Sequence, residues 1–573
     1  MTCHLGQKTL FKQLIFILML LSYQSYSSDM TSLLSPSDET CRTVDIGFKW
    51  EKRKRAAFAT SLAQQPNSLV QSNCLLFTGI SPFITLTNES NIEVSIDGGD
   101  YRPMPAIIFS GNTVRLRKAA RNRFGDNKIY SIYILGDGKN NHNMQTGRIE
   151  WTIQTHGVYR EKKIWNVGPN EPAKQLKDIT NLLAPGDEIH LMGDAIYDPI
   201  DIRGISGTRA LPITLKGISK NGKRPTLRGG TERFNWTLAL RNSHFWHIDN
   251  IILERGGICY RHESAYIKLS KVLIRHCGNG ILGTDYNSGS LHISQLELTR
   301  SGGKPEKKNW RHGIYMATDR DRFPESIFTI EKSFLHNNKG NAIKSRAERT
   351  EVYGNWLENT TNQQSIYALE LIGYDGYETL EPINHDVVGN VIAINSIKYG
   401  VRVGGDGTGS SNGPSRFSEN IFLMPKDFKG YIFRLLGHLQ FLDITNNMFL
   451  SQNQGSKSIT LIKDYIPSAQ WFYQMPHIRV SGNTFTSNIN FYHSEESGKV
   501  TNYEGIYKYI DVNNNETLQL DFLTNGSIHN IIFEKLSLKK AYINTKVTHP
   551  RFFEKLYNPK LNQRPHAGGI PFQ

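Results

Sequence analysis

The sequence is poor in cysteine and in long apolar runs. Only five of its 573 residues are cysteines, and they form neither a Cys-x-x-Cys pair nor a His/Cys cluster with zinc spacing, so a structural metal is not expected. In an oxidising compartment, four of them would permit two local disulfides, Cys41–Cys74 and Cys259–Cys277. The apolar run at residues 14–21 is too short to span a bilayer, so we expect no membrane insertion.

The first 27 residues have the three parts of a secretory signal peptide. Lys8 and Lys12 form a basic start, the apolar run follows, and Ser25-Tyr26-Ser27 has the small-x-small pattern of a cleavage site. This pattern predicts an exported protein, periplasmic or secreted.

Acidic residues are outnumbered, with 52 Asp and Glu against 67 Lys and Arg. The formal charge is +15, and it falls to +13 when the two lysines of the leader are removed. Because this charge is scattered and no nucleic-acid motif occurs, nucleic acid is not the expected partner. An acidic polysaccharide fits an exported basic protein better, and we expect a monomer.

Residues 28–160 read as a small β-sandwich. Stretches such as "ITLTNESNIEVSIDGGDY" and "GRIEWTIQT" alternate apolar and polar residues between Asn, Gly and Asp turns. With "VSIDGGDY" and "GNTVRLR", this part resembles bacterial immunoglobulin-like modules. That resemblance implies a module that spaces or binds.

One local pattern recurs after residue 160, at intervals of 21 to 37 residues. It appears as "HIDNIIL", "EVYGNWL", "DVVGNVI", "DITNNMF" and "RVSGNTF", an apolar strand that turns at a polar residue, often asparagine, into a second apolar strand. A repeat of short strands without helical periodicity predicts a right-handed parallel β-helix, here over residues 161–495. We expect an inward ladder at one corner, formed by Asn355, Asn390, Asn420, Asn447 and Asn483. Residues 496–573 would be an extension or a cap over the open end.

Residues 182–217, "LLAPGDEIHLMGDAIYDPIDIRGISGTRALPITLKG", resemble the opening of the pectate-lyase-like β-helix superfamily. The family of chondroitinase B and β-helical alginate lyases is the nearest. The resemblance implies the β-helix fold strongly and a polysaccharide lyase activity more weakly.

The strands that follow the asparagine corners can be aligned because equivalent positions of successive coils stack about 4.8 Å apart. They read "HGIYMA", "NAIKSR", "YALELI", "YGVRVG" and "YIFRLL". Pointing their central apolar residues inward places one outward row in register, Tyr315, Lys344, Glu370, Arg402 and Arg434. Two residues earlier we expect a groove floor of mostly small residues on the same face, Gly313, Ala342, Ala368, Gly400 and Tyr431.

Cations, a tyrosine and a histidine cluster on consecutive coils of this face. β-Elimination of a uronic-acid polymer needs cations for the sugar carboxylate, a base for the C5 proton and an acid for the leaving oxygen. The predicted catalytic residues are His312, Tyr315, Lys344, Arg346 and Arg402. The predicted substrate-binding residues are Arg311, Lys339, Glu370 and Arg434.

In the chondroitinase B family a lysine in a Lys-Ser strand acts as the base, and Lys344-Ser345 resembles that strand. Glutamates that bind calcium in the family correspond here to Asn337 and Lys339, so the resemblance does not support calcium by that route. Lys339 would stand where the metal's charge lies. The family's Leu-Arg-His-Gly motif is replaced by "LELIG", which lacks the arginine, so another acid would be required, either Tyr315 or His312.

Glu370 argues against Lys344 as the base. A lysine one coil away from a carboxylate stays protonated, and a protonated lysine cannot accept the C5 proton. We therefore assign carboxylate binding to Lys344, Arg346 and Arg402, and proton transfer to His312 and Tyr315.

Two alternatives remain open. A glycoside hydrolase on the same fold would need paired carboxylates, for which Asp319, Asp321, Glu370 and Asp375 are candidates, although the first two lie in a loop where solvated acids are expected. A non-catalytic β-helix that binds anionic glycan at the cell surface would need no paired carboxylates.

Overall fold

The computed structural model describes residues 41–45, 55–80, 82–135, 145–158, 160–230, 236–303, 311–359, 367–375, 384–394, 399–405, 409–424, 428, 430–436, 439–451, 459–464, 477–485, 489–494 and 510–517. The expected leader at 1–27 lies outside these residues, as does nearly all of the expected extension at 496–573. No helix within the described ranges is long and apolar enough to cross a membrane.

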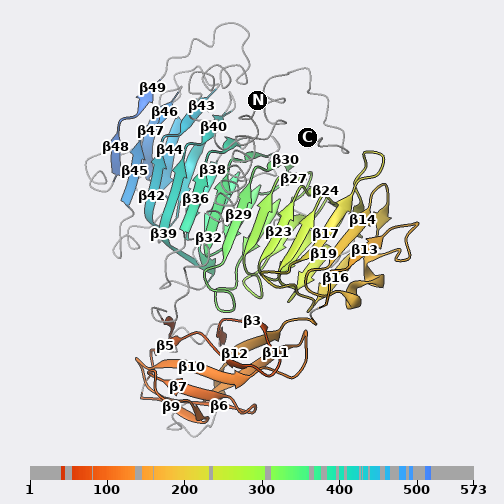
Figure 1. Cartoon of the computed structure of the whole chain (residues 1–573). Coiled ribbons are helices and arrows are strands. Elements are labelled where there is room, and N and C mark those ends of the chain that lie inside the picture. Colours follow the sequence, from red (N-terminus) through yellow and green to blue (C-terminus); the bar gives the residue numbers. More distant parts are fainter. Residues whose placement is uncertain are drawn as a thin grey trace, which may run out of the picture. The chain divides into compact units, whose positions relative to one another are not determined.

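Two six-stranded sheets hold the first twelve strands (Figure 1). One has the order β1-β5-β10-β7-β8 with β4 beside β10, and the other β2-β12-β11-β6-β9 with β3 beside β12. Their bounds are β1 Arg42–Asp45, β2 Arg55–Ala57, β3 Ser61–Gln64, β4 Leu69–Gln71, β5 Leu75–Thr78, β6 Ile84–Asn88, β7 Glu93–Ile96, β8 Arg102–Pro103, β9 Ala106–Ile108, β10 Thr113–Ala119, β11 Asn127–Leu135 and β12 Gln145–Thr155. Two sheets agree with the expected sandwich, while the immunoglobulin-like assignment and the domain boundaries stay predictions.

The remaining strands form three long parallel sheets, which we number I, II and III. Sheet I contains β13 Ile164–Val167, β14 Glu188–Met192, β17 Ile213–Ile218, β20 Trp246–Asp249, β23 Ile267–Ser270, β26 Leu291–Ser294, β29 Ile327–Glu331, β32 Arg349–Tyr353, β36 Asn384–Val388, β39 Gly409–Ser418, β42 Leu439–Thr445, β45 His477–Ser481 and β48 Ile510–Asn513, with β35 Tyr374–Asp375 antiparallel to β39. Two short 3-10 turns, Leu176–Asp178 and Thr180–Leu182, precede β14.

Sheets II and III complete each coil. Sheet II contains β15 Ile196–Tyr197, β18 Thr226–Arg228, β21 Ile252–Glu254, β24 Leu273–Arg275, β27 Glu297–Thr299, β30 Phe334–Asn338, β33 Trp356–Asn359, β37 Val391–Ala393, β40 Ile421–Met424, β43 Met448–Ser451, β46 Thr484–Phe485 and β49 Glu516–Thr517. Sheet III contains β16 Ile200–Arg203, β19 Trp236–Arg241, β22 Ile258–Glu263, β25 Asn279–Gly283, β28 Ile314–Ala317, β31 Ile343–Arg346, β34 Leu369–Ile372, β38 Tyr399–Gly404, β41 Tyr431–Leu435, β44 Ile459–Asp464 and β47 Ile489–Ser494.

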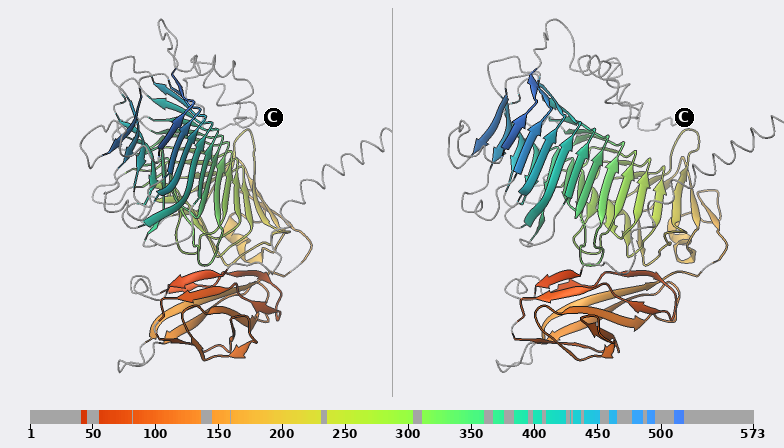
Figure 2. Two further views of the ribbon diagram at one scale, coloured as in Figure 1. Left: turned by 90° about the vertical axis from the view of Figure 1, so that its left-hand side faces the viewer. Right: turned by 60° about the vertical axis from the view of Figure 1, so that its left-hand side comes forward.

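The chain therefore visits sheets I, II and III in turn and returns to sheet I one strand further along (Figure 2). This is a parallel β-helix with the long parallel sheets typical of the right-handed form, and it confirms the predicted all-β fold. The apolar residues of the predicted repeat, from Ile248 to Val480, point into one continuous core and are at most 1% exposed where they occur in sheet I.

The predicted asparagine ladder is confirmed at the corner between sheets I and II. The side-chain amide of Asn390 donates to the backbone oxygen of Val352 at 2.8 Å and to Oδ1 of Asn420 at 2.9 Å, and the same pattern repeats through Asn447 and Asn483. Asn515 extends it by one coil. Because buried amides must be paired, each asparagine depends on its neighbours.

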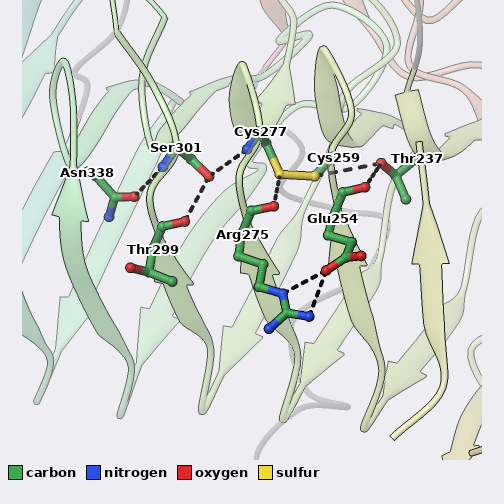
Figure 3. Close-up of a disulfide and its surroundings, with 8 residues drawn as sticks. All are labelled: Thr237, Glu254, Cys259, Arg275, Cys277, Thr299, Ser301 and Asn338. Carbon is green, nitrogen blue, oxygen red and sulfur yellow. Dashed lines mark hydrogen bonds and ion pairs between the residues drawn. A yellow bond between two sulfur atoms is a disulfide. The ribbon is translucent and has the colours of Figure 1, made fainter. Parts of the chain in front are cut away.

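A disulfide joins two successive coils at the corner between sheets II and III (Figure 3). Cys259 and Cys277 are buried, and the backbone N–H of Cys277 donates to Oγ of Ser301, whose own N–H donates to Oδ1 of Asn338. The second pair, Cys41–Cys74, is also formed. Both local pairings that the sequence permits are therefore confirmed.

Replacing both Cys259 and Cys277 with serine should lower the free energy of unfolding by about 3 kcal/mol, because the bond closes a loop with a sequence separation of 18. Urea denaturation monitored by circular dichroism would measure the change. The Cys41→Ser/Cys74→Ser variant is the matched control, since its loop lies outside the β-helix. An unaltered midpoint for β-helix unfolding in the first variant would contradict the prediction.

His385 lies inside the core, where burial lowers its pKa to about 3. An unfolded histidine takes up a proton below about pH 6.5, whereas the folded one stays neutral until about pH 3. The unfolded state therefore binds more protons across this window, and stability falls as the pH falls, by about 1.4 kcal/mol per pH unit.

Between pH 6.5 and 5, the free energy of unfolding of the His385→Gln variant should fall by about 2 kcal/mol less than that of the wild type. Denaturant titrations at several pH values would show it as a flatter stability profile. His292→Gln, the same substitution at a side chain 43% exposed, is the control because it leaves the buried histidine in place. Equal profiles for wild type and His385→Gln would refute the assignment.

Candidate functional site

The predicted outward row is present on sheet III. Tyr315 pairs with Lys344, Lys344 with Glu370, Glu370 with Arg402, and Arg402 with Arg434 in successive parallel strands. The inward neighbours in the same strands, such as Ile343 and Leu369, are fully buried. The predicted register is therefore confirmed.

Glu370 lies at the centre of this row and is only 3% exposed. Its Oε1 accepts a hydrogen bond from Nη1 of Arg402 at 2.5 Å, and its Oε2 lies 3.7 Å from Nζ of Lys344. The side-chain amide of Asn341 also donates to Oε2. Two hydrogen-bond donors and the nearby ammonium of Lys344 thus surround one buried carboxylate, which links three consecutive coils and orients both cations.

Tyr315 is supported by two cations. Nε of Arg346 donates to its phenolic oxygen at 3.2 Å, and Nζ of Lys344 lies 5.0 Å from the centre of its ring. Arg346 is 6% exposed and also donates through Nη1 to the backbone oxygen of Gly373 at 2.6 Å. This geometry suits an arginine that fixes Tyr315 and stabilises a negative charge on its oxygen.

His312 stands beside Tyr315, with the two rings perpendicular and 5.7 Å apart. Burial lowers the pKa of His312 to about 3, and the charge of Lys344 acts in the same direction, so the ring is neutral at ordinary pH. Its Nδ1 accepts the backbone N–H of Asn341 at 3.2 Å. The proton of the neutral ring is therefore on Nε2, and His312 is suited to donate a hydrogen bond rather than to accept a proton.

The predicted groove floor of small residues is not present, so this prediction is wrong. Ala342 and Ala368 belong to the central core, and a Cβ at Gly400 would lie 2.4 Å from Cδ1 of the core residue Ile394. A Cβ at Gly313 would likewise meet the side chain of Leu298. At the start of these five sheet III strands two successive residues are buried, so the alternation of inward and outward residues used for the prediction fails there.

Tyr431 was also misplaced in that prediction. It lies three residues before Arg434, and the residue two before, Ile432, is fully buried. Tyr431 instead stacks on Tyr399 with ring centres 6.0 Å apart, and Tyr399 contacts Tyr367 in a tilted arrangement with ring centres 5.6 Å apart. A ladder of tyrosines therefore runs beside the charged row.

A cationic side chain from the next coil lies over the ring of each tyrosine in this ladder. Arg402 lies 5.9 Å from the ring centre of Tyr367, and Arg434 lies 5.1 Å from that of Tyr399. Lys463, which pairs with Arg434 in the sheet, lies 4.5 Å from the ring of Tyr431. The predicted site residues did not include Lys463, Tyr367 or Tyr399, although each ladder tyrosine stands three residues before a residue of the charged row.

Arg311 and Lys339 lie at the corner that leads into sheet III, outside the charged row. The side chain of Arg311 is half-buried and runs over Gly278, where an added Cβ would meet Nη1 at 2.5 Å. Lys339 is exposed, as is Asn337 in the other position where the related family has a calcium ligand. Within the described ranges, no three His, Cys, Asp or Glu side chains gather as a metal site. Catalysis without calcium stays a prediction.

The loop carboxylates do not form a solvated pair. Asp319 is 3% exposed and accepts the backbone N–H groups of Asn287, Asp321 and Arg322, as well as Nη1 of Arg322 at 2.7 Å. The expectation of a solvated acid is wrong here, because the loop folds around this carboxylate. Asp319 stabilises the loop, and its oxygens are occupied. The side chain of Asp375 lies outside the described residues.

Neither a family model nor a curated protein matches the chain. Solved structures that resemble it include pectate lyase Pel9A, with 12% identity over 65% of this chain and 83% of that one and a TM-score of 0.34. An alginate lyase from Paenibacillus sp. str. FPU-7 covers 61% of this chain and 99% of its own at 13% identity, with a TM-score of 0.33. The PL6 family polysaccharide lyase Pedsa3628 from Pseudopedobacter saltans covers 60% and 91% at 14% identity, with a TM-score of 0.34.

These scores are too low to assign the chain to a family. Its fold is established by its own strand pairing, in three sheets of 13, 12 and 11 parallel strands.

Proposed function

We propose that the protein is an exported polysaccharide lyase, periplasmic or secreted, that cleaves an acidic, uronic-acid-containing polysaccharide by β-elimination. The observation that carries the proposal is the row Tyr315, Lys344, Glu370 and Arg402 on adjacent strands, with Arg346 bonded to Tyr315. It combines cations for a sugar carboxylate with a tyrosine held for proton transfer. The monomeric state stays a prediction.

In the proposed reaction, Lys344 and Arg402 bind the carboxylate of the uronate and stabilise the charge that builds up on it when C5 loses its proton. Tyr315, as phenolate, accepts that proton, and Arg346 stabilises the phenolate through its Nε–H. The C4–C5 double bond forms while the C4–O bond breaks. Tyr315 returns the proton to the leaving oxygen, and His312 donates a hydrogen bond from Nε2.

The hydrolase alternative has less support. Of its four proposed carboxylates, Asp319 is enclosed by backbone N–H groups and Glu370 by Arg402, Lys344 and Asn341. Non-catalytic binding has one observation in its favour. The cations continue to Arg434 and Lys463, beyond the residues proposed for proton transfer.

The deciding experiment is to incubate the purified protein with alginate, pectate, glycosaminoglycans and bacterial exopolysaccharides. A lyase produces the ultraviolet absorbance of an unsaturated uronide together with new reducing ends. New reducing ends without that absorbance would indicate a hydrolase. Binding of a polyanion without any shortening of the polymer would indicate a surface scaffold and would overturn the lyase proposal.

A further inference from the structure

Three basic residues stack at the corner between sheets II and III. Arg255, His276 and Arg300 each follow directly after the last residue of a sheet II strand, and those last residues pair with one another in the sheet. The backbone N–H of Arg255 donates to the oxygen of the residue before His276, and that of His276 to the oxygen of the residue before Arg300, each at 3.3 Å. The three residues therefore lie on consecutive coils, about 4.8 Å apart along the axis. We call them the basic corner.

The side chains of the basic corner have no partner that neutralises them. All three are exposed, and none makes an ion pair or a hydrogen bond within the part of the chain that the structure describes. The acid next to Arg255, Glu254, is 3% exposed and already bonds Arg228 and Arg275. Like charges on neighbouring coils repel one another, and an anion bound across the basic corner would relieve this repulsion.

The turn itself does not require basic residues. Arg255, His276 and Arg300 have φ angles of 61°, 58° and 53°, in the left-handed region. Asn250 and Gln295 have the same conformation at the corner between sheets I and II, with φ angles of 57° and 56°. The charge of the basic corner is therefore not explained by its backbone.

The backbone under the basic corner is held in place. The disulfide between Cys259 and Cys277 joins its first two coils, and Cys277 directly follows His276 (Figure 3). The backbone N–H of Cys277 donates to Oγ of Ser301, the residue after Arg300. A surface that is already rigid loses less entropy when a ligand binds.

Along the axis, the basic corner lies on the side of Tyr315 opposite to Arg402 and Arg434. The coil of Arg300 continues into β28, which contains Tyr315, and the rest of the basic corner lies in the two coils before it. Arg402 and Arg434 lie three and four coils after Tyr315. A polymer bound at Tyr315 therefore has cations beyond it in both directions.

Sheet III offers less to an anion on the side of the basic corner. Next to Tyr315 its outward row continues with Leu282, Arg261 and Ala239. Nε of Arg261 donates to Oε1 of Glu263 at 2.8 Å, so its charge is compensated. An anionic chain that extends past Tyr315 in this direction is attracted to the basic corner more than to the sheet.

We propose that the basic corner is an accessory binding surface for acidic polysaccharide, which holds the part of the polymer that extends beyond Tyr315. A linear polyanion carries charges at regular intervals and can contact several stacked cations at once, which a single small anion cannot. The class of polymer rests on the proposed function, whereas binding at the basic corner requires no cleavage.

The test measures binding of alginate, and of dextran sulfate as a second polyanion, by isothermal titration calorimetry in the Tyr315→Phe background, so that cleavage does not interfere. Arg255→Gln/Arg300→Gln should raise the Kd about 10-fold at low salt and make it less dependent on salt concentration, because two cations no longer displace counterions. Lys271→Gln/Lys332→Gln is the matched control. It removes the same charge from left-handed residues at the corner between sheets I and II, and it should leave the Kd nearly unchanged.

His276 provides a second readout that does not depend on affinity. Partial desolvation and the charges of Arg300 and Arg275 hold the pKa of His276 below its usual value, and Arg255 acts in the same direction while Glu254 opposes it. A polyanion at the basic corner should raise this pKa. An NMR titration of the His276 ring with and without alginate, its signal identified with His276→Gln, would show the change.

The outcomes separate this proposal from the proposed function. Equal Kd values for the arginine variant and the lysine control, in a protein that proves to be a lyase, would overturn the accessory surface alone. Weaker binding by the arginine variant of a protein that cleaves no polymer would overturn the lyase alone. A protein that binds neither polyanion would refute the accessory surface. So would normal polyanion binding by the arginine variant with loss of binding to phosphatidylglycerol vesicles, which would assign the basic corner to a lipid surface.

Discussion

Tyr315→Phe should reduce the turnover of the acidic polymer by at least about 100-fold, because the change removes the only oxygen of this side chain that can carry the proton. The ring stays, so Lys344 keeps its contact with it, and the loss of the acceptor for the Nε–H of the buried Arg346 should cost about 1–3 kcal/mol of stability. Initial rates of ultraviolet absorbance, with substrate concentration varied, would show a fall in kcat at little change in KM.

Tyr353→Phe is the matched control. It is the same substitution on sheet I, at a tyrosine that donates to Asp386, and it should leave turnover unchanged. Full activity in Tyr315→Phe would remove Tyr315 from the mechanism even if the protein proves to be a lyase.

Arg346 is a positioning residue in this scheme, and its variant provides a second readout. Arg346→Met removes the donor to the phenolic oxygen, so the phenolate becomes harder to form. The activity of this variant should require a higher pH than that of the wild type. A loss of activity without a shift of the pH profile would indicate a structural role alone.

The strand register of the site could be predicted from the sequence because a one-residue slip would expose residues such as Ile343 and Leu369 and bury Lys344. That argument holds only where the chain is extended. At the start of β31, Ala342 and Ile343 both face the core, and the assumption that inward and outward residues alternate misplaced the small residues for this reason.

Other features of the site depend on burial and on partners distant in the sequence, and the alternation of apolar and polar residues does not reveal these. The loop around Asp319 reads as polar and solvated, yet its backbone folds around the carboxylate. The contact between Arg346 and Tyr315 joins residues 31 positions apart, and the carboxylate-binding role predicted for Arg346 from the sequence did not include it. The tyrosine ladder could have been predicted, since Tyr367, Tyr399 and Tyr431 occur at one offset from the charged row.

The variant Glu370→Gln should lower the free energy of unfolding by about 3–5 kcal/mol, because it leaves two cations near one another without their shared carboxylate. Lys344 and Arg402 are only 16% and 19% exposed, so water compensates for little of the loss. Denaturant unfolding would measure the effect, and the binding of acidic oligosaccharides should weaken as the two cations lose their orientation.

The chain contains a matched control for this change. Glu254 on sheet II is equally buried, at 3% exposed, and bonds Arg228 and Arg275 from the two neighbouring coils, each at 2.7 Å. Glu254→Gln should therefore destabilise the β-helix by a similar amount and leave binding and turnover of the folded protein unchanged. If both variants lose stability and binding together, the carboxylate of Glu370 stabilises the fold without any separate role in orienting the cations for substrate.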